Sequence, residues 1–315
     1  MSISLRTSRP AQSDVAIVLC TDARFLVAAT ALAHQLATSG ETDNIDIVVS
    51  VTEDCKIPPS LDFLNLRICH MNTEGMFSGL FIGPRHTEAV YHRLALPHAF
   101  AEDYKRLLYL DCDLFFHGGD LDALLRQDMQ GHAVAAALDY PLWFNPDHHA
   151  KQLKDCGLNV APYFNSGVML IDVAAFEAQD ILNRCLEFGR QNHDRMSQHD
   201  QQLLNCVLHG TWYELDRTWN WQQIYRDGKK TVKNPVKFTH FIGNRKPWSD
   251  SKHLIPDQFK EALRAFASEH YTGSPEHRIL EKRKGVRDWF RLLRPRNFWR
   301  HLRVRKQTRM MLAQQ

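Results

Sequence analysis

The sequence predicts an α/β protein with a doubly wound, mixed but mostly parallel sheet flanked by helices. Short apolar runs alternate with helix-compatible stretches over most of the 315 residues, an order typical of strand–helix–strand units. The hydrophobic fraction of 44% indicates a chain that forms a sizeable core. Acidic and other polar residues follow several of the apolar runs, and sheets of this kind bind ligands at the carboxyl ends of their strands.

The apolar runs define the elements in order. The first, DVAIVLC at residues 14–20, is short and rich in β-formers, and a helix-compatible stretch follows to about Ser39. The other expected strands are residues 44–51, 65–70, 106–110, 133–138, 164–171, 212–215 and 236–241. Helices are expected at residues 87–100 and 259–270, and after the strands at 133–138 and 164–171. The long loops 72–86 and 140–162 are predicted to act as lids or binding loops.

The charge distribution divides the chain into two parts. From Arg278 onward there are 13 Lys and Arg residues but only two acidic residues, so this segment carries a net charge of +11, whereas the whole chain carries +3. We predict one domain over residues 1–275 and a basic amphipathic helical tail over residues 276–315. Because Trp and Phe lie among the basic residues, the tail is predicted to bind an anionic membrane surface. Nucleic-acid binding is the less favoured alternative, since no recognised motif accompanies the tail, and a simple solvated tail remains open.

Composition also indicates the compartment. The seven cysteines are scattered, without a C-x-x-C pair, and are expected to be thiols of a reducing cytoplasm. The N-terminal segment lacks the apolar core of a signal peptide, and no apolar run approaches the ~20 residues that span a bilayer. We therefore expect a cytoplasmic protein that is peripheral at the inner face of the cytoplasmic membrane.

The acidic pair Asp111 and Asp113 ends the apolar run RLLYLDCDLFF. Residues i and i+2 of an extended segment point the same way, so both carboxylates can face one cation. A divalent metal would remove their mutual repulsion and could hold the oxygens of a diphosphate. The structural alternative is a strand end with two solvated acids.

A second polar segment is HFIGNRKPW, in which His240 closes an apolar strand. Its imidazole could be a third metal ligand beside the acidic pair, and Lys246 could contact a phosphate. Gly243 permits a close backbone approach. A hydrogen-bonded structural histidine is the alternative reading of His240.

Further polar groups stand at strand and helix ends. Asn165, Ser166 and the bare backbone of Gly167, in YFNSGVMLID, suit hydrogen bonds to sugar hydroxyls, although such residues also favour turns. Asp200 and Gln201 open a helix in HDQQLLN, where Asp200 could simply be a cap. Arg93, before the acidic strand, could point at the same pocket or cover its own helix.

These segments, in this order and spacing, resemble the family 8 glycosyltransferases, a retaining group that includes lipopolysaccharide galactosyl- and glucosyltransferases. The resemblance runs from about Asp14 to Trp248 and implies a single GT-A domain, a UDP-sugar donor and a Mn²⁺ ion, for which Mg²⁺ could substitute. Asp111, Asp113 and His240 would be the metal ligands. The implied donor-binding residues are Cys20, Thr21, Asp22, Arg93, Asp111, Cys112, Asp113, Asn165, Ser166, Asp200, Gln201, Gly243 and Lys246.

The chain departs from the family pattern at two places. Many members have Ala or Val before the first aspartate, where this chain has Cys20 and Thr21, and Arg24 stands where an Asn is often found. Both departures concern the base and ribose contacts and leave the metal site unaffected.

The implied activity is transfer of galactose or glucose from a UDP-sugar to a saccharide acceptor, such as lipopolysaccharide or another lipid-linked glycan. Asp139, Asp200 and Gln201 would be the catalytic group near the transferred sugar. The amide of Gln201 is a poor nucleophile, so we expect a front-face mechanism in which the departing phosphate accepts the acceptor's proton. A transferase with a soluble or protein acceptor, a nucleotidyltransferase and a non-catalytic binder remain as alternatives.

Overall fold

The computed structural model describes residues 3–51, 55–84, 86–223, 235–243, 245–250 and 255–272. The predicted tail, residues 276–315, lies outside these ranges, as does its boundary with the preceding domain. Every candidate site residue falls inside them.

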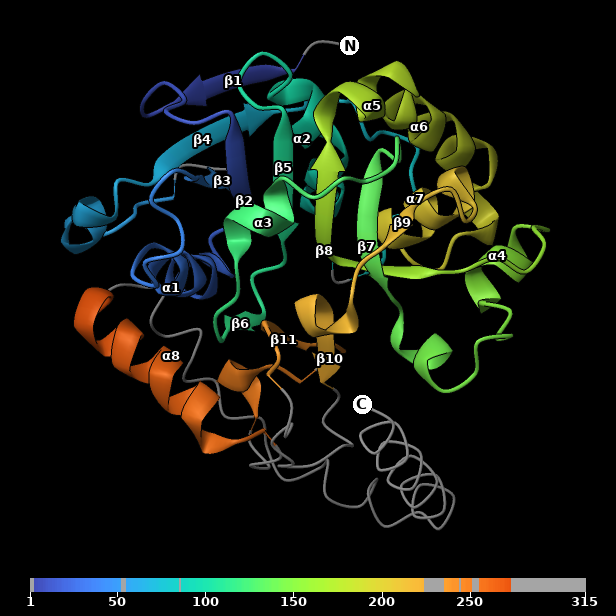
Figure 1. Cartoon of the computed structure of the whole chain (residues 1–315). Helices are drawn as coiled ribbons and strands as arrows, with labels where there is room; N and C mark the ends of the chain where they lie inside the picture. The colour runs from blue at the N-terminus through green and yellow to red at the C-terminus, as the bar shows by residue number, and fades with distance from the viewer. Residues whose placement is uncertain are drawn as a thin grey trace.

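The described strands form two sheets (Figure 1). The larger has eight strands in the order β1-β4-β3-β2-β5-β8-β7-β9, and the smaller has three in the order β10-β11-β6. The strands of the larger sheet are β1 (Ser4–Thr7), β2 (Val15–Thr21), β3 (Asp46–Val51), β4 (Arg67–Asn72), β5 (Arg106–Leu110), β7 (Val134–Leu138), β8 (Phe164–Asp172) and β9 (Tyr213–Glu214). Those of the smaller sheet are β6 (Leu114–Phe116), β10 (Trp221–Gln223) and β11 (Phe238–Phe241).

The strand directions confirm a mixed, mostly parallel sheet. Strands β4, β3, β2 and β5 run parallel to one another, and β7 pairs with β9 in parallel. Strand β1 is antiparallel to β4, and β8 is antiparallel to both of its neighbours. Because β8 runs against β5, its first residues lie at the carboxyl end of β5, where Asp111 begins the acidic segment.

The helices cover both faces of the larger sheet. The described α-helices are α1 (Leu26–Ala37), α2 (His92–Ala99), α3 (Leu121–Leu125), α4 (Lys151–Asp155), α5 (Val173–Ala178), α6 (Ile181–Gln191), α7 (Asp200–Leu208) and α8 (Asp257–His270). In Figure 1, α1 and α8 lie toward the lower left, and α5, α6 and α7 gather on the right. Asp120 and Asp172 accept hydrogen bonds from the first turns of α3 and α5, as N-cap residues do.

Alternating side chains produce two separate cores. In β2, Ala16 and Val18 pack with residues of α2, α6 and α7, whereas Ile17 and Leu19 pack with residues of α1, α3 and α8. This alternation follows from the two-residue period of a strand. A sheet buried on both faces explains why its strands read as continuous apolar runs in the sequence.

Several short elements were not predicted from the sequence. Strands β1, β6 and β10 have only three or four residues each, too few to show a clear period. The predicted loop 140–162 contains the 3₁₀ helix η3 (Tyr140–Trp143) and α4, so it is not one long irregular lid. The structure also has the 3₁₀ helices η2 (Glu88–Tyr91), before α2, and η5 (Arg217–Asn220), before β10.

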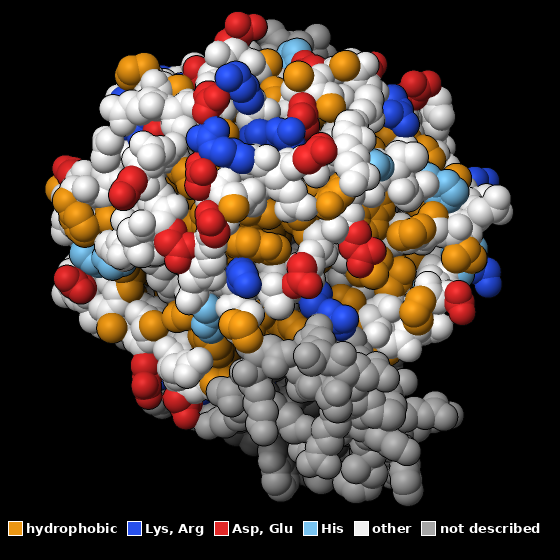
Figure 2. Space-filling model, viewed as in Figure 1, with side chains coloured by type: hydrophobic (Ala, Val, Ile, Leu, Met, Phe, Trp, Pro, Cys, Tyr) orange, Lys and Arg blue, Asp and Glu red, His pale blue; other side chains and the backbone are white. Residues whose placement is uncertain are grey.

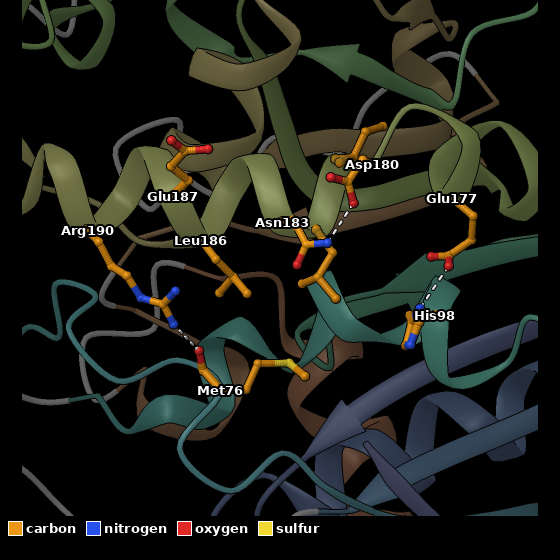
Figure 3. Close-up of a pocket in the computed structure, with 10 residues that line it drawn as sticks. Met76, His98, Glu177, Asp180, Asn183, Leu186, Glu187 and Arg190 are labelled. Carbon is orange, nitrogen blue, oxygen red and sulfur yellow. Dashed lines mark hydrogen bonds and ion pairs between the residues drawn. The ribbon is translucent and has the colours of Figure 1, made fainter. Parts of the chain in front are cut away.

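The loop 72–86 is attached to the body of the protein. Arg190 of α6 donates hydrogen bonds to the carbonyl oxygens of Met76 and Ser78, at 2.8 and 3.1 Å, and Figure 3 shows the first of them across a cavity of about 510 Å³. Phe77 is fully buried. Met76, Phe77 and Leu80 of this loop therefore pack in the core.

The face of the molecule drawn in Figure 2 carries charged side chains of both signs. Figure 2 shows acidic side chains spread over one face, with Lys and Arg side chains among them. Among the described residues, no helix is both long and apolar enough to cross a membrane.

Candidate active site

The acidic pair lies between the two sheets. Asp111 follows β5 directly, and its backbone N–H donates to the carbonyl of Gly167 at 2.8 Å, which extends the pairing of β5 with β8. Strand β6 starts at Leu114 and pairs with β11, which carries His240. Ligand atoms of Asp111, Asp113 and His240 consequently lie within 4.8 Å of one another.

The protonation of His240 decides what this cluster can bind. Its Nδ1 lies 2.9 Å from Oδ1 of Asn220, whose Nδ2 donates to Oδ1 of Asn165 at 2.9 Å. A neutral imidazole, the form that binds a metal, would carry its proton on Nδ1, because Oδ1 of Asn220 can only accept. The lone pair on Nε2 then faces Oδ1 of Asp113 at 3.1 Å and Oδ2 of Asp111 at 3.7 Å.

Three electron-rich atoms facing one another fit a cation. Oδ1 of Asp113 is buried and receives no hydrogen bond from the described residues. Metal-bound histidines usually donate their second N–H to a protein acceptor, as His240 does to Asn220. Two carboxylates and one imidazole suit a divalent ion, so Asp111, Asp113 and His240 fit a metal site.

Lys246 closes one side of the cluster. Its ammonium donates to Oδ2 of Asp113 and, at 2.6 Å, to the carbonyl of Phe241. Burial raises the pKa of Asp113, but the positive charge beside it, that of Lys246 first, outweighs this effect and holds the pKa below its ordinary value. Asp113 is thus kept ionised, as a metal ligand must be.

Gly167 makes room for the cluster. A Cβ atom at this position would come within 2.7 Å of His240 Nδ1 and 2.9 Å of Asp111 Oδ2. The sequence suggested that this segment of β8 offers bare backbone to sugar hydroxyls. The structure gives Gly167 a different task, because its missing side chain is what allows the two candidate ligands to approach.

Arg93 joins the acidic pair to α7. From α2 its guanidinium reaches Asp111 Oδ1 at 3.0 Å and Asp200 Oδ2 at 3.2 Å, and it lies 4.4 Å from the ring centroid of Tyr109. Tyr109 in turn donates its hydroxyl to Asp111 Oδ1 at 2.8 Å. Arg93 therefore points into the site and does not merely cover its own helix.

The first residues of β8 and α7 form a polar wall beside this pair. Ser166 donates its hydroxyl to Asp200 at 2.9 Å, so Asp200 does not act as a helix cap. Gln201 Oε1 accepts from the Asn165 amide and from the Ser166 backbone, both at 3.2 Å. Asp139, after β7, accepts from the Asn165 amide at 3.3 Å.

Burial raises the pKa of both carboxyls in this wall. At Asp139 desolvation outweighs the hydrogen bond from Asn165. At Asp200 desolvation outweighs the opposing charge of Arg93. Perturbed carboxyls that converge on one side of a candidate metal site are typical of a functional centre.

The front strand ends beside the acidic pair. The Cys112 thiol lies 3.2 Å from the carbonyl oxygen of Cys20, and burial raises the pKa of both thiols, that of Cys20 to about 12. Thr21 is buried and donates its hydroxyl to the carbonyl of Asp22. The Asp22 carboxylate is bound by Arg24 through Nε at 2.8 Å. Asp22 and Arg24 line a separate open pocket of about 910 Å³ at the ends of β2, β3 and β4.

Most of the predicted site residues thus converge, and some unpredicted ones join them. Gly243 adopts a positive φ of 82° with open space around it, which agrees with a backbone that a ligand can approach. Asn220 and Tyr109 were not singled out from the sequence. Asn220 carried no local signal, because its partners His240 and Asn165 belong to β11 and β8. Tyr109 donates to Asp111 two residues further on, and its second partner, Arg93, comes from α2.

The class of protein follows from this fold and site. The solved structure of the galactosyltransferase LgtC, in complex with donor and acceptor sugar analogues, aligns with 84% of this chain and 99% of its own, with a TM-score of 0.67 and 23% identity. That likeness shows a shared fold with GT-A-like architecture. Residues 16–252 match Glycosyl transferase family 8, and the chain therefore belongs to that family. The expected family is confirmed.

Curated relatives agree with the family. General stress protein A of Bacillus subtilis is 31% identical over 191 residues, which are 55% of this chain and 64% of that protein. Lipopolysaccharide 1,3-galactosyltransferase of Salmonella typhimurium is 30% identical over 171 residues, 51% of this chain and 50% of that protein. The chain spans less than two thirds of the length of either.

Proposed function

We propose that this protein is a Mn²⁺-dependent retaining hexosyltransferase that moves glucose or galactose from a UDP-sugar to a saccharide acceptor. The observation that supports it most is the arrangement at His240. Its Nδ1 is bound to Asn220, so in the neutral imidazole the lone pair of Nε2 faces two carboxylates, one of which has a buried oxygen without a donor among the described residues. This arrangement favours a metal-assisted reaction of a diphosphate over a purely structural acidic cluster.

Asp111, Asp113 and His240 would hold the ion, with Mg²⁺ as a possible substitute. When bound, a Mn²⁺ ion acts as a Lewis acid that stabilises negative charge on the diphosphate of the donor. Lys246 keeps Asp113 ionised and adds a positive charge within reach of the same oxygens. Arg93 holds Asp111 from the opposite side and fixes the direction of its carboxylate.

The transfer itself exchanges one glycosidic bond for another. The bond from the anomeric carbon to the β-phosphate oxygen breaks, and a bond from that carbon to an acceptor hydroxyl oxygen forms. The hydroxyl proton passes to the departing phosphate oxygen. The products are UDP and the extended saccharide. Retention follows if departure and attack occur on the same face of the sugar.

The wall of Asp139, Asp200 and Gln201 would orient and support the sugar. Gln201 is a poor nucleophile because it is an amide whose carbonyl oxygen already accepts two hydrogen bonds. Asp200 is held by Ser166 and Arg93. We therefore favour the front-face route, and intact-mass spectrometry after incubation with donor should reveal no glycosylated enzyme. A stable glycosyl adduct on Asp200 or Gln201 would disprove the front-face route.

Two relatives and the basic tail support the proposed acceptor and place of action. The two relatives are named for transfer to lipopolysaccharide, and the segment from Arg278 onward, of charge +11, suits an anionic membrane. A lipid-linked saccharide at the inner face of the cytoplasmic membrane fits both. The tail, residues 276–315, would form a unit separate from the domain of residues 1–275.

The test is a hydrolysis screen with UDP-, GDP- and ADP-sugars, with and without Mn²⁺, for wild type and His240→Ala. We expect free hexose from UDP-glucose or UDP-galactose, only with metal, and its loss in the variant. Release of UMP would indicate a nucleotidyltransferase, and the absence of any turnover with preserved binding would indicate a nucleotide-sugar binder. Asn183→Ala on the surface of α6 serves as the matched control.

A further inference from the structure

Four aromatic side chains form a cluster next to the candidate active site. Tyr140, Trp143 and Phe144 follow β7, and Trp221 begins β10. Ring centroids are 5.4 Å apart for Tyr140 and Trp143, 5.0 Å for Tyr140 and Phe144, and 5.1 Å for Trp143 and Trp221. We call these four residues the aromatic platform.

The platform lies at the edge of the hydrophobic core, because Trp221 is buried and the other three rings are partly exposed. None of its residues belongs to the clusters that fill the two faces of the sheet. Tyr140, Trp143 and Phe144 are partly exposed, whereas Leu142 between them is buried in the core and anchors the turn. A cluster of large aromatic rings at the solvent boundary is typical of a surface that binds a ligand or a partner.

Hydrogen bonds hold the platform in one orientation. The Trp143 indole donates to the carbonyl of Leu138 at 2.8 Å. Gln222, which is buried, accepts from the backbone N–H of Tyr140 and donates to the same Leu138 carbonyl, both at 2.8 Å. The rings are therefore preorganised, which reduces the entropy lost when a ligand binds.

The strand that positions the platform also positions the candidate metal ligand. Gln222 is the register partner of His240 in the β10–β11 pair. Asn220 accepts from His240, and Trp221, between Asn220 and Gln222, contributes to the platform. Asp139 precedes Tyr140 and shares the Asn165 amide with Gln201. The platform and the sugar-facing wall are thus consecutive parts of one surface.

A pyranose ring matches this surface chemically. It has an apolar C–H face, which an aromatic ring covers, and hydroxyl groups at its edge, which a carboxylate such as Asp139 can accept from. Arg93 links Asp111 to Asp200, so the donor diphosphate would lie by Asp200, whereas the platform begins directly after Asp139. The ring that lies on the platform would then be the acceptor's.

We infer that the aromatic platform binds a saccharide ring of the acceptor by stacking, with Trp143 as its central residue and Asp139 beside the reacting hydroxyl. This inference rests on the proposed function. It restricts the acceptor to a chain that ends in a sugar ring and argues against an acceptor that is a peptide hydroxyl.

The test measures hydrolysis and transfer side by side. Wild type, Trp143→Ala and Trp143→Phe are assayed with Mn²⁺ and the active UDP-sugar, first alone and then with lactose, maltose, cellobiose or melibiose. Phe63→Ala, which removes an exposed ring from η1 (Pro59–Leu64), is the matched control. Thermal unfolding of each variant checks that the fold is retained.

We expect wild type to use at least one of these disaccharides. Trp143→Ala should raise the KM for that acceptor about tenfold or more, equivalent to about 1.4 kcal/mol of lost binding, while hydrolysis without acceptor stays at the wild-type rate. Trp143→Phe should recover most of the affinity, and Phe63→Ala should match wild type.

Other outcomes overturn the inference in distinguishable ways. An unchanged acceptor KM in Trp143→Ala, or equal losses of hydrolysis and transfer, would show that the platform has no acceptor role. Hydrolysis by wild type without transfer to any disaccharide would also reject the platform but leave the metal-dependent sugar chemistry intact. Absence of both hydrolysis and transfer in wild type would overturn the proposed function and the platform together.

Discussion

Nδ1 of His240 lies 2.9 Å from Oδ1 of Asn220, and this contact leaves Nε2 facing Asp113. Asn220 is completely buried. The Asn220 amide therefore determines the tautomer of His240. That tautomer decides whether His240 offers the acidic pair a metal-binding lone pair or a hydrogen-bond donor.

Replacement of Asn220 should weaken metal binding without removing a ligand. Asn220→Ala is expected to lower the affinity for Mn²⁺ about 10- to 100-fold, the usual effect of losing a group that orients a metal ligand. Isothermal titration calorimetry measures it directly. Asn183→Ala, which removes an exposed amide that bonds to Asp180, should bind as wild type does. Equal affinities for Asn220→Ala and wild type would contradict the assigned tautomer.

Gly167 should tolerate no side chain. In Gly167→Ala the new methyl group would press on His240 and on Asp111, and we expect Mn²⁺ binding and metal-dependent hydrolysis to be lost. Gly131→Asn is a suitable control, since Gly131 has a positive φ of 79° with open space around it and Asn tolerates that conformation. Normal hydrolysis by Gly167→Ala would mean that the two ligands do not act together.

Removal of Lys246 should destabilise the metal-free protein in a pH-dependent way. Burial raises the pKa of Asp113, but the positive charge beside it, that of Lys246 first, lowers it below its ordinary value. A depressed carboxyl pKa stabilises the fold above the ordinary Asp pKa of about 3.9, and this contribution disappears as the pH falls toward the lowered value. Lys246→Met is therefore expected to lose about 3 kcal/mol of unfolding free energy at neutral pH.

Urea denaturation with chelator, repeated between neutral and acidic pH, measures this effect. The difference from wild type should shrink once the pH is below about 4. Lys151→Met removes the exposed ion pair with Asp155, and its cost should stay near or below about 0.5 kcal/mol. A pH-independent deficit in Lys246→Met would show that the lysine acts through packing and not through the charge of Asp113.

The basic tail should carry the membrane affinity. The full chain is expected to sediment with vesicles that contain anionic lipid, and a chain truncated at Glu276 is not. Because each basic group near the surface contributes about 1 kcal/mol, binding should fall steeply with added salt. Neutral vesicles are the control. Salt-independent binding, or equal binding by the truncated chain, would contradict an electrostatic role of the tail.

Much of the fold was readable from local patterns. The apolar runs that became β2, β3, β5 and β8 are buried on both faces, so each appears in the sequence as a continuous hydrophobic segment. The short strands β6 and β10 were missed, since three residues cannot display a period. Strand β6 exists because β11 pairs with it, which is a tertiary cause.

The candidate metal residues were predicted for a similar reason. Asp111 and Asp113 are two residues apart at the end of a strand, and that spacing alone puts both carboxylates on one side. Lys246 was predicted to contact a phosphate, but in the structure it is bonded to Asp113. Its partner lies more than 100 residues away in the chain, so no local pattern could have shown the pair.

By itself the sequence determined the fold class through strand periodicity, and the resemblance of its strand-end motifs to a known family pointed to that family and to the three metal-ligand candidates. Only the tertiary structure decided how those ligands are oriented. The register of β10 against β11 places Gln222 opposite His240 and brings Asn220 to its Nδ1. Antiparallel β8 places Gly167 against the acidic pair. Contacts of this kind depend on which strands become neighbours, and the acidic pair becomes a candidate metal centre only through them.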